Sequence, residues 1–186
     1  VIKDSAGDAG KALSLAKQLV EEDKVFPAIG SSTSGESMKI KQYMDENATL
    51  LLSCAAAESI TTPILKWVFK TPQNDANAAR WIFTDMKKKG LKKVGVLASN
   101  SGFGKAGQAQ LEKLAPEFGI EIAISETYAK DEVDLDAVQL QFAHHVLGAI
   151  GADQGATLQD LPRQLAAQES RPAGNHDSHL LSSVMW

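Results

Sequence analysis

The sequence contains little of what would place it in several common protein classes. Cys54 is the one cysteine in 186 residues, which excludes an internal disulfide and a multi-cysteine metal site. Basic residues are not in excess, with 19 Lys and Arg against 23 Asp and Glu, so nothing predicts a nucleic-acid partner. No apolar run approaches the roughly 20 residues of a membrane span. The remaining composition, 44% hydrophobic and 23% charged, is that of a globular protein.

Two kinds of segment alternate along the chain. Apolar residues at helical spacing predict helices over Ala9–Glu22, Ser34–Asn47, Asp75–Lys89 with a stop at Gly90, and Gly104–Phe118. Short apolar runs predict strands over Val25–Ile29, Leu50–Ser53, Val94–Ala98 and Glu121–Thr127. Strands joined by helices imply an α/β fold with doubly wound parallel sheets, in which ligands bind at the carboxyl ends of the strands. Function is therefore expected in the loops after Ile29, Ser53 and Ala98.

The first of these loops, residues 30–37, reads Gly-Ser-Ser-Thr-Ser-Gly-Glu-Ser and leads directly into a helix. Free backbone N–H groups and hydroxyls at a helix start suit a carboxylate or phosphate, because the donors and the helix dipole favour the same charge. The alternative is that Thr33 and Glu36 simply form a capping box that begins the helix. The two interpretations are compatible.

The second loop, residues 53–59, is built mainly from small side chains that let the main chain approach a ligand. Cys54 in this loop could suggest a nucleophile, but all four histidines lie beyond residue 143 and none is an obvious base for it. We therefore interpret Cys54 as a buried structural thiol.

The third loop contains a formal G-x-G-x-x-G over residues 102–107, with Glu126 near the end of the next strand. This pattern favours a dinucleotide site only when the glycines follow the strand directly, and here residues 99–101 intervene. We expect Phe103 instead to be exposed at the loop tip and to cover a small ligand as an aromatic lid.

Three runs of residues together resemble one protein family. They are Asp4-Ser5-Ala6-Gly7-Asp8, the stretch from Ile29 to Ser37, and Leu52-Ser53-Cys54-Ala55-Ala56-Ala57. Their order and spacing are similar to those of the type I periplasmic solute-binding proteins, the leucine/isoleucine/valine-binding receptors of ABC importers. Residues 67–72 resemble the first crossover between the two lobes of that family, and residues 101–104 resemble the opening loop of the second lobe. The resemblance covers residue 1 to about residue 136.

The resemblance implies a ligand-binding protein that is not an enzyme and needs no cofactor or metal. Its two lobes would close on a branched-chain or related amino acid or a small carboxylate. By position, Ser34 and the Ala57 amide would hold the ligand carboxylate, the Ala55 carbonyl would accept from an ammonium group, and Phe103 would cover the ligand. The implied partner is a membrane permease, and the implied location is periplasmic or extracellular, with lipid or membrane association in some relatives.

One departure from the family pattern leaves the ligand class open. Ala57 stands where members commonly carry Thr or Ser, so one hydroxyl contact to an α-amino acid is absent. An aromatic or short organic acid is therefore an alternative ligand. A ligand-sensing domain of a regulator or receptor is the alternative function, and a nicotinamide-dependent oxidoreductase is less favoured.

The resemblance also predicts the domain organisation. Residues 1–71 would be part of the first lobe and residues 72–136 part of the second, with a central first strand missing ahead of Val1 and marginal stability as a result. All lysines occur by Lys130 and all histidines from His144 on. We therefore interpret residues 137–186 as an atypical tail, frameshifted or disordered. Within it we expect a short helix over Ala143–Ile150, an irregular segment over Pro172–Ser183, and solvent-exposed histidines that bind no metal.

Overall fold

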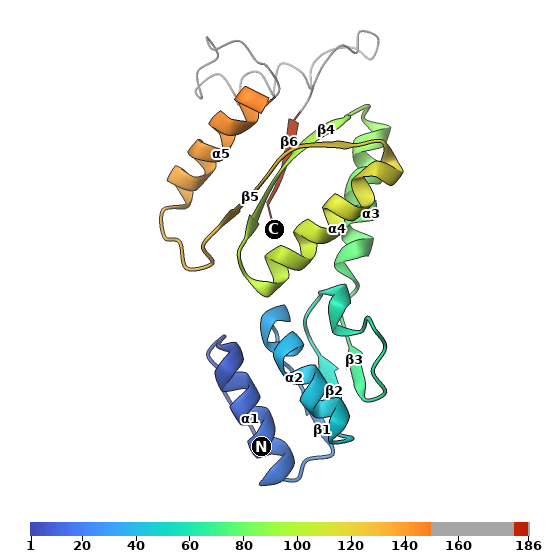
Figure 1. Ribbon diagram of the computed structural model, residues 1–186, viewed down its shortest axis with the longest axis vertical. Coiled ribbons are helices and arrows are strands. Elements are labelled where there is room, and N and C mark those ends of the chain that lie inside the picture. The colour runs from blue at the N-terminus through green and yellow to red at the C-terminus, as the bar shows by residue number, and fades with distance from the viewer. Residues whose placement is uncertain (150–180, 186) are drawn as a thin grey trace. The chain divides into compact units, whose positions relative to one another are not determined.

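The computed structural model describes residues 1–149 and 181–185 (Figure 1). The chain divides into two compact units. The first comprises Val1–Ala79 together with Ser101–Gln110, and the second comprises Arg80–Asn100 together with the described residues from Leu111 on. No described helix has both the length and the apolar character of a membrane span.

The first unit is a three-stranded parallel sheet with two helices before and between its strands. In chain order its elements are α1 (Ala9–Glu21), β1 (Pro27–Ile29), α2 (Ser34–Glu46), β2 (Leu50–Ser53), a 3-10 turn η1 (Glu58–Ile60) and β3 (Val68–Lys70). The sheet order is β1-β2-β3, and β2 aligns Leu51 with Ala28 on one side and with Val68 on the other. The predicted parallel α/β arrangement is confirmed here.

The helices of this unit begin at side chains that satisfy their first N–H groups. Asp8 caps α1 by accepting a hydrogen bond from the Lys11 N–H at 2.6 Å, and Thr33 caps α2. α2 packs against the sheet, and α1 packs against α2. The fully or largely buried side chains of this core are Ala12, Ala16, Ile40, Met44, Leu51, Ala55, Ala57, Ile60 and Val68.

The outer edge of β1 is unpaired within the described sheet. Phe26, just before β1, and Ile29, at its end, are 66% and 76% exposed, and Val1 and Ile2 at the start of the sequence are exposed as well. Apolar surface is thus left in water at and near this strand. Marginal stability remains a prediction.

The second unit is built on another three-stranded parallel sheet, with the order β5-β4-β6. Its strands are β4 (Lys93–Ser99), β5 (Glu121–Tyr128) and β6 (Leu181–Met185). Its helices are the later parts of α3 (Asp75–Lys88) and of α4 (Gly102–Phe118), and α5 (Leu135–Ala149). Gly90 has a φ of +73° and follows α3, which confirms it as a helix stop. Residues 94–98 of β4 are all buried, so this strand is the centre of the unit.

Two predictions for the end of the chain need correction. The helix expected over Ala143–Ile150 is longer and begins at Leu135, because Phe142 and Val146 pack with Leu97 of β4 and stabilise it. Of the irregular segment expected over Pro172–Ser183, residues 172–180 lie outside the described residues. Its last three residues belong to β6, where the prediction is wrong because they pair with β4. The lobe boundary at residue 71 and the tail boundary at residue 137 stay predictions.

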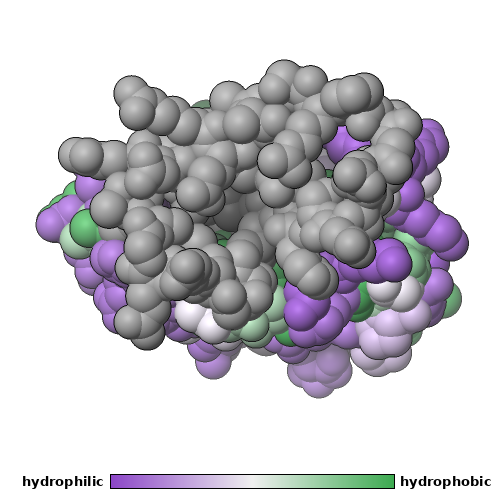
Figure 2. All heavy atoms as spheres, turned by 90° about the horizontal axis from the view of Figure 1, so that it is seen from above, coloured by the Kyte–Doolittle hydropathy of each residue, from purple (hydrophilic) through white to green (hydrophobic). Residues whose placement is uncertain are grey.

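The visible surface is consistent with the charged composition. In the view of Figure 2, the described side chains at the margin are mostly hydrophilic, with smaller hydrophobic areas between them.

Candidate functional site

The first predicted loop turns sharply and begins α2 with a capping box. Gly30, with a φ of +124°, changes the chain direction after β1. The Thr33 hydroxyl accepts from the Glu36 N–H at 3.4 Å and donates to the Glu36 carboxylate at 2.5 Å. The capping interpretation is therefore confirmed, although the glutamate reaches the threonine hydroxyl and not its backbone N–H.

Ser34 and Ala57, which the sequence assigns to one site, lie together. Ser34 is the first residue of α2, and its Oγ accepts a hydrogen bond from the Ala57 N–H at 3.3 Å. Both residues are at most 1% exposed. A hydroxyl accepts through its lone pairs, so this bond leaves the Ser34 hydrogen available for donation. Ser34 Oγ and the Ala57 N–H are thus two neighbouring donors beside the start of a helix, an arrangement suited to a carboxylate.

Three serine hydroxyls, two of them buried, fix the beginning of the second loop. The hydroxyls of Ser31, Ser37 and Ser53 form a chain, with 2.9 Å between the first two and 2.7 Å between the last two. The Ala55 N–H donates to Ser53 Oγ at 3.1 Å, and Ala55 is 2% exposed. The chain of hydroxyls holds the backbone around Ala55 against α2. The predicted role of the Ala55 carbonyl remains a prediction.

Two charged residues that the sequence analysis did not assign to the site hold the rest of this loop. Lys70, at the end of β3, donates from Nζ to the Ala56 carbonyl at 2.6 Å and to the Ala57 carbonyl at 3.4 Å. Asp75, at the start of α3, accepts from the Glu58 N–H at 3.0 Å and is 2% exposed. Desolvation lowers the pKa of Lys70, while the negative charges of Asp75 and Glu58 oppose this shift.

Phe103 lies in the first turn of α4, in the segment that belongs to the first unit. The helix begins at Gly102, two residues earlier than predicted, so Phe103 is partly buried and is not an exposed loop tip. Gly102 lies against Gly35: a Cβ at Gly102 would be 2.7 Å from the Gly35 Cα. The start of α4 thus requires a glycine at position 102, which gives the first glycine of the G-x-G-x-x-G pattern a packing explanation within this unit.

The prediction that Cys54 is a buried thiol is wrong. The thiol is exposed, not buried, although Ser53 and Ala55 on either side of it are both buried. Successive side chains of an extended backbone point to opposite sides, and Cys54 takes the side that faces solvent.

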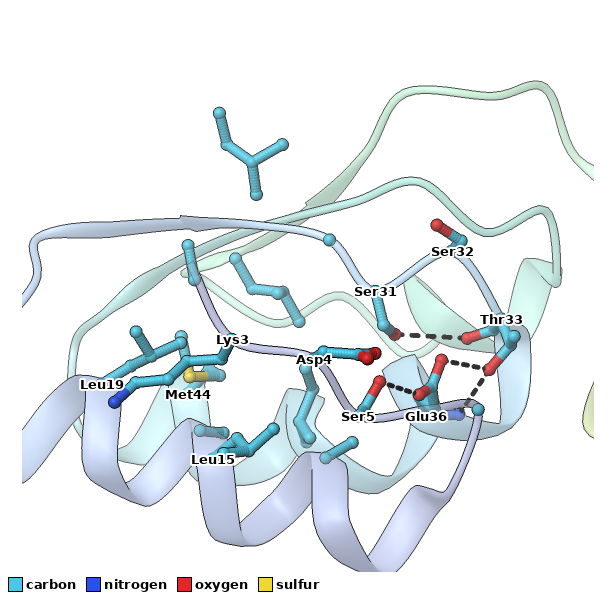
Figure 3. A pocket seen from close by; sticks show the side chains of 18 residues that line it. Lys3, Asp4, Ser5, Leu15, Leu19, Ser31, Ser32, Thr33, Glu36 and Met44 are labelled. Carbon is cyan, nitrogen blue, oxygen red and sulfur yellow. Dashed lines mark hydrogen bonds between the residues drawn. The ribbon is translucent and has the colours of Figure 1, made fainter. Parts of the chain in front are cut away.

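A cavity of about 430 Å³ in the first unit lies between α1, α2 and β1 (Figure 3). Glu36 is buried at its edge and accepts hydrogen bonds from Ser5 and Thr33, and Asp4 is nearby. Two carboxylates make this cavity a poor place for an anion. None of the predicted site residues lines this cavity, neither Ser34 and Ala57 nor Ala55 and Phe103. We therefore place the candidate site outside the cavity, at Ser34 and Ala57.

The described histidines do not form a metal site. His145 Nδ1 lies 2.6 Å from the Glu126 carboxylate, and no group of three or more potential ligands occurs in residues 1–149 and 181–185. His176 and His179 lie outside the described residues.

Residues 1–168 match the model of the family described as "Periplasmic binding protein". The chain belongs to the periplasmic binding protein family. The match extends past residue 136, into the stretch whose composition differs. No curated protein sequence matches the chain.

Solved periplasmic binding proteins share the fold. An extracellular ligand-binding receptor from Rhodopseudomonas palustris HaA2 is 31% identical with a TM-score of 0.70, and the match covers 76% of this chain and 40% of the receptor. Two R. palustris solute-binding proteins of ABC transporters, in complex with benzoate and with 4-hydroxybenzoate, are 22% and 19% identical, both with TM-scores of 0.69. These matches cover 76% and 78% of this chain, respectively, and 40% of each protein. The chain thus spans about 40% of the length of these periplasmic binding proteins.

Proposed function

We propose that the chain is part of the solute-binding component of an ABC importer and that Ser34 and Ala57 bind the carboxylate of its ligand. The observation that carries the proposal is the 3.3 Å contact between Ser34 Oγ and the Ala57 N–H at the start of α2. A carboxylate in this place would exchange one weak neutral hydrogen bond for two charge-assisted ones. The role is binding without chemical conversion, in the periplasm or outside the cell, with a membrane permease as partner.

We propose an aromatic carboxylate, and not a branched-chain amino acid, as the ligand class. Ala57 offers a backbone N–H but no hydroxyl, which removes one contact to an α-amino acid head group. Two solved relatives of the same fold hold benzoate and 4-hydroxybenzoate. Phe103, partly buried at the start of α4, is the side chain that would pack on the ring.

Titration calorimetry tests this proposal with benzoate, 4-hydroxybenzoate and leucine, and with uncharged benzamide as the control ligand. We expect both benzoates to bind and benzamide to bind much more weakly. Ser34→Ala should weaken benzoate by about 1 to 3 kcal/mol, because a charge-assisted hydrogen bond is lost.

Ser14→Ala is the matched control. Ser14 is on α1 and its hydroxyl contacts only its own helix in the described structure, through the Gly10 carbonyl, so benzoate affinity should not change. Equal affinity of the parent and Ser34→Ala for benzoate would overturn the assignment of the site. Binding of leucine but not of benzoate would overturn the ligand class alone.

A further inference from the structure

The peptide group between Ala56 and Ala57 is held from one side and presented to the site from the other. Its carbonyl, on Ala56, accepts from Lys70 Nζ at 2.6 Å and from the Asp75 N–H at 3.3 Å. Its N–H, on Ala57, points to Ser34 Oγ. In a trans peptide the C=O and N–H point in opposite directions, so fixing the carbonyl also fixes the direction of the N–H.

The next peptide group is held by the side chains of both Lys70 and Asp75. The Ala57 carbonyl lies 3.4 Å from Lys70 Nζ, and the Glu58 N–H donates to Asp75 Oδ1 at 3.0 Å. Asp75 Oδ1 also accepts the Ala76 N–H at 3.0 Å, which ties the loop to the first turn of α3. Ala57 therefore has its flanking peptide groups attached to a cation and an anion on two different elements.

Burial makes this arrangement energetically demanding. Asp75 is 2% exposed and its Oδ2 has no hydrogen-bond partner among the described residues. A buried carboxylate of this kind is costly unless a positive charge is near. Lys70 is the cation that acts on it, and the same ammonium polarises the Ala56 carbonyl.

We propose that Lys70 and Asp75 are positioning residues for ligand binding. Lys70 aims and strengthens the Ala57 N–H, which receives the carboxylate, by its hydrogen bond to the Ala56 carbonyl, and the Asp75 carboxylate fixes the next peptide group through the Glu58 N–H. A hydrogen bond from a cation to the carbonyl of a peptide makes the N–H of the same peptide a better donor. Neither side chain needs to touch the ligand. The inference rests on the proposed function, in which the Ala57 N–H is a ligand donor.

The first arm of the test needs no ligand and uses NMR of the ¹⁵N-labelled 186-residue chain. Lys70→Met should shift the Ala57 amide resonance and speed its hydrogen exchange, while the Ala55 amide, held by Ser53, should change little. Lys70→Arg keeps a cationic donor and should restore much of the parent behaviour. Lys39→Met, an exposed lysine on α2, is the control. An Ala57 amide that is unchanged in Lys70→Met would overturn the proposal whether or not a ligand binds.

The second arm measures benzoate affinity. Lys70→Met and Asp75→Ala should raise the Kd at least about tenfold, Asp75→Asn should raise it less because one oxygen acceptor is kept, and Lys39→Met should leave it unchanged. Spectral dispersion confirms that each variant is folded, which separates a lost donor from lost structure. Equal benzoate affinity in the parent and a folded Lys70→Met would also overturn the proposal. A parent that binds no benzoate contradicts the proposed ligand class, and the first arm still decides the positioning role.

Discussion

At the scale of single residues, the candidate site consists of one pair of donors and of the two charged residues that hold the peptide groups beside it. Ser34 Oγ lies 3.3 Å from the Ala57 nitrogen, and the resemblance to one family was enough to assign both residues to a site. Lys70 was placed only in residues 67–72, which resemble the crossover between the lobes, and Asp75 only at the start of a predicted helix. Their role depends on which carbonyl lies within reach in three dimensions, and sequence spacing carries no such information.

Gly95 offers a test of packing at the same scale. It lies on β4, where an added Cβ would be 2.9 Å from Val146 and 3.0 Å from Phe142, both on α5. Gly95→Ala should destabilise the chain by about 1 to 3 kcal/mol, because α5 would have to move away from the sheet. Urea denaturation measures the change.

Gly148→Ala is the matched control for this substitution. Gly148 is exposed on α5 and an added Cβ meets no atom within 4 Å. The change should be neutral or stabilise the helix by up to about 1 kcal/mol. If both alanine variants had the same stability, the close packing of α5 on β4 would be contradicted.

At the scale of elements, sequence periodicity predicted most helices and strands to within a residue or two. The helix expected over Ser34–Asn47 is α2, Ser34–Glu46, and the strand expected over Leu50–Ser53 is β2 with the same bounds. Amphipathic spacing suffices for such elements because their apolar faces meet a sheet. It failed at α5, whose first half has a mixed pattern and is stabilised by its contacts with the sheet.

The contact between α1 and α2 has a pH dependence that can be measured. The Tyr43 hydroxyl donates to the Glu21 carboxylate at 2.7 Å. This hydrogen bond, helped by desolvation and by the negative charge, raises the pKa of Tyr43 to about 12. The neutral phenol is the favoured form, so its contribution to stability is complete below the ordinary pKa of 10 and is lost as the pH rises through about 12.

An absorbance titration of the phenolate checks this shift. In the parent, one tyrosine should ionise near pH 12, and Tyr43→Phe should remove that step. Glu21→Gln should move the step back toward pH 10, because the carboxylate acceptor is gone. A step that stayed near pH 12 in Glu21→Gln would show that the carboxylate is not the cause.

At the scale of the whole molecule, each unit has a core of its own. Leu51 is fully buried in the first unit, and Phe83 is fully buried in the second, where its ring lies 5.7 Å from that of Phe118. The α/β class and the parallel sheets could be predicted from the sequence, because helical crossovers force strands to run in parallel. The division after residues 79, 100 and 110 depends on long-range packing, which the sequence pattern does not contain.

Separate cores predict separate responses to mutation. Leu51→Ala should cost about 2 to 5 kcal/mol and reduce amide protection mainly in residues 1–79, whereas Phe83→Ala should act mainly on β4 and β5. Hydrogen exchange with mass spectrometry resolves the two sets of peptides. Equal loss of protection in both units for each variant would mean that the chain opens as one cooperative body.

The exposed thiol of Cys54 has a practical consequence. It is the one cysteine in the sequence and stands directly before Ala55, in the loop whose backbone forms the candidate site. A maleimide dye would therefore attach at a single place without mutagenesis, next to the groups proposed to receive the ligand. Such a conjugate would turn ligand capture into a change in fluorescence, and the chain itself into a reagentless sensor for the solutes offered to it.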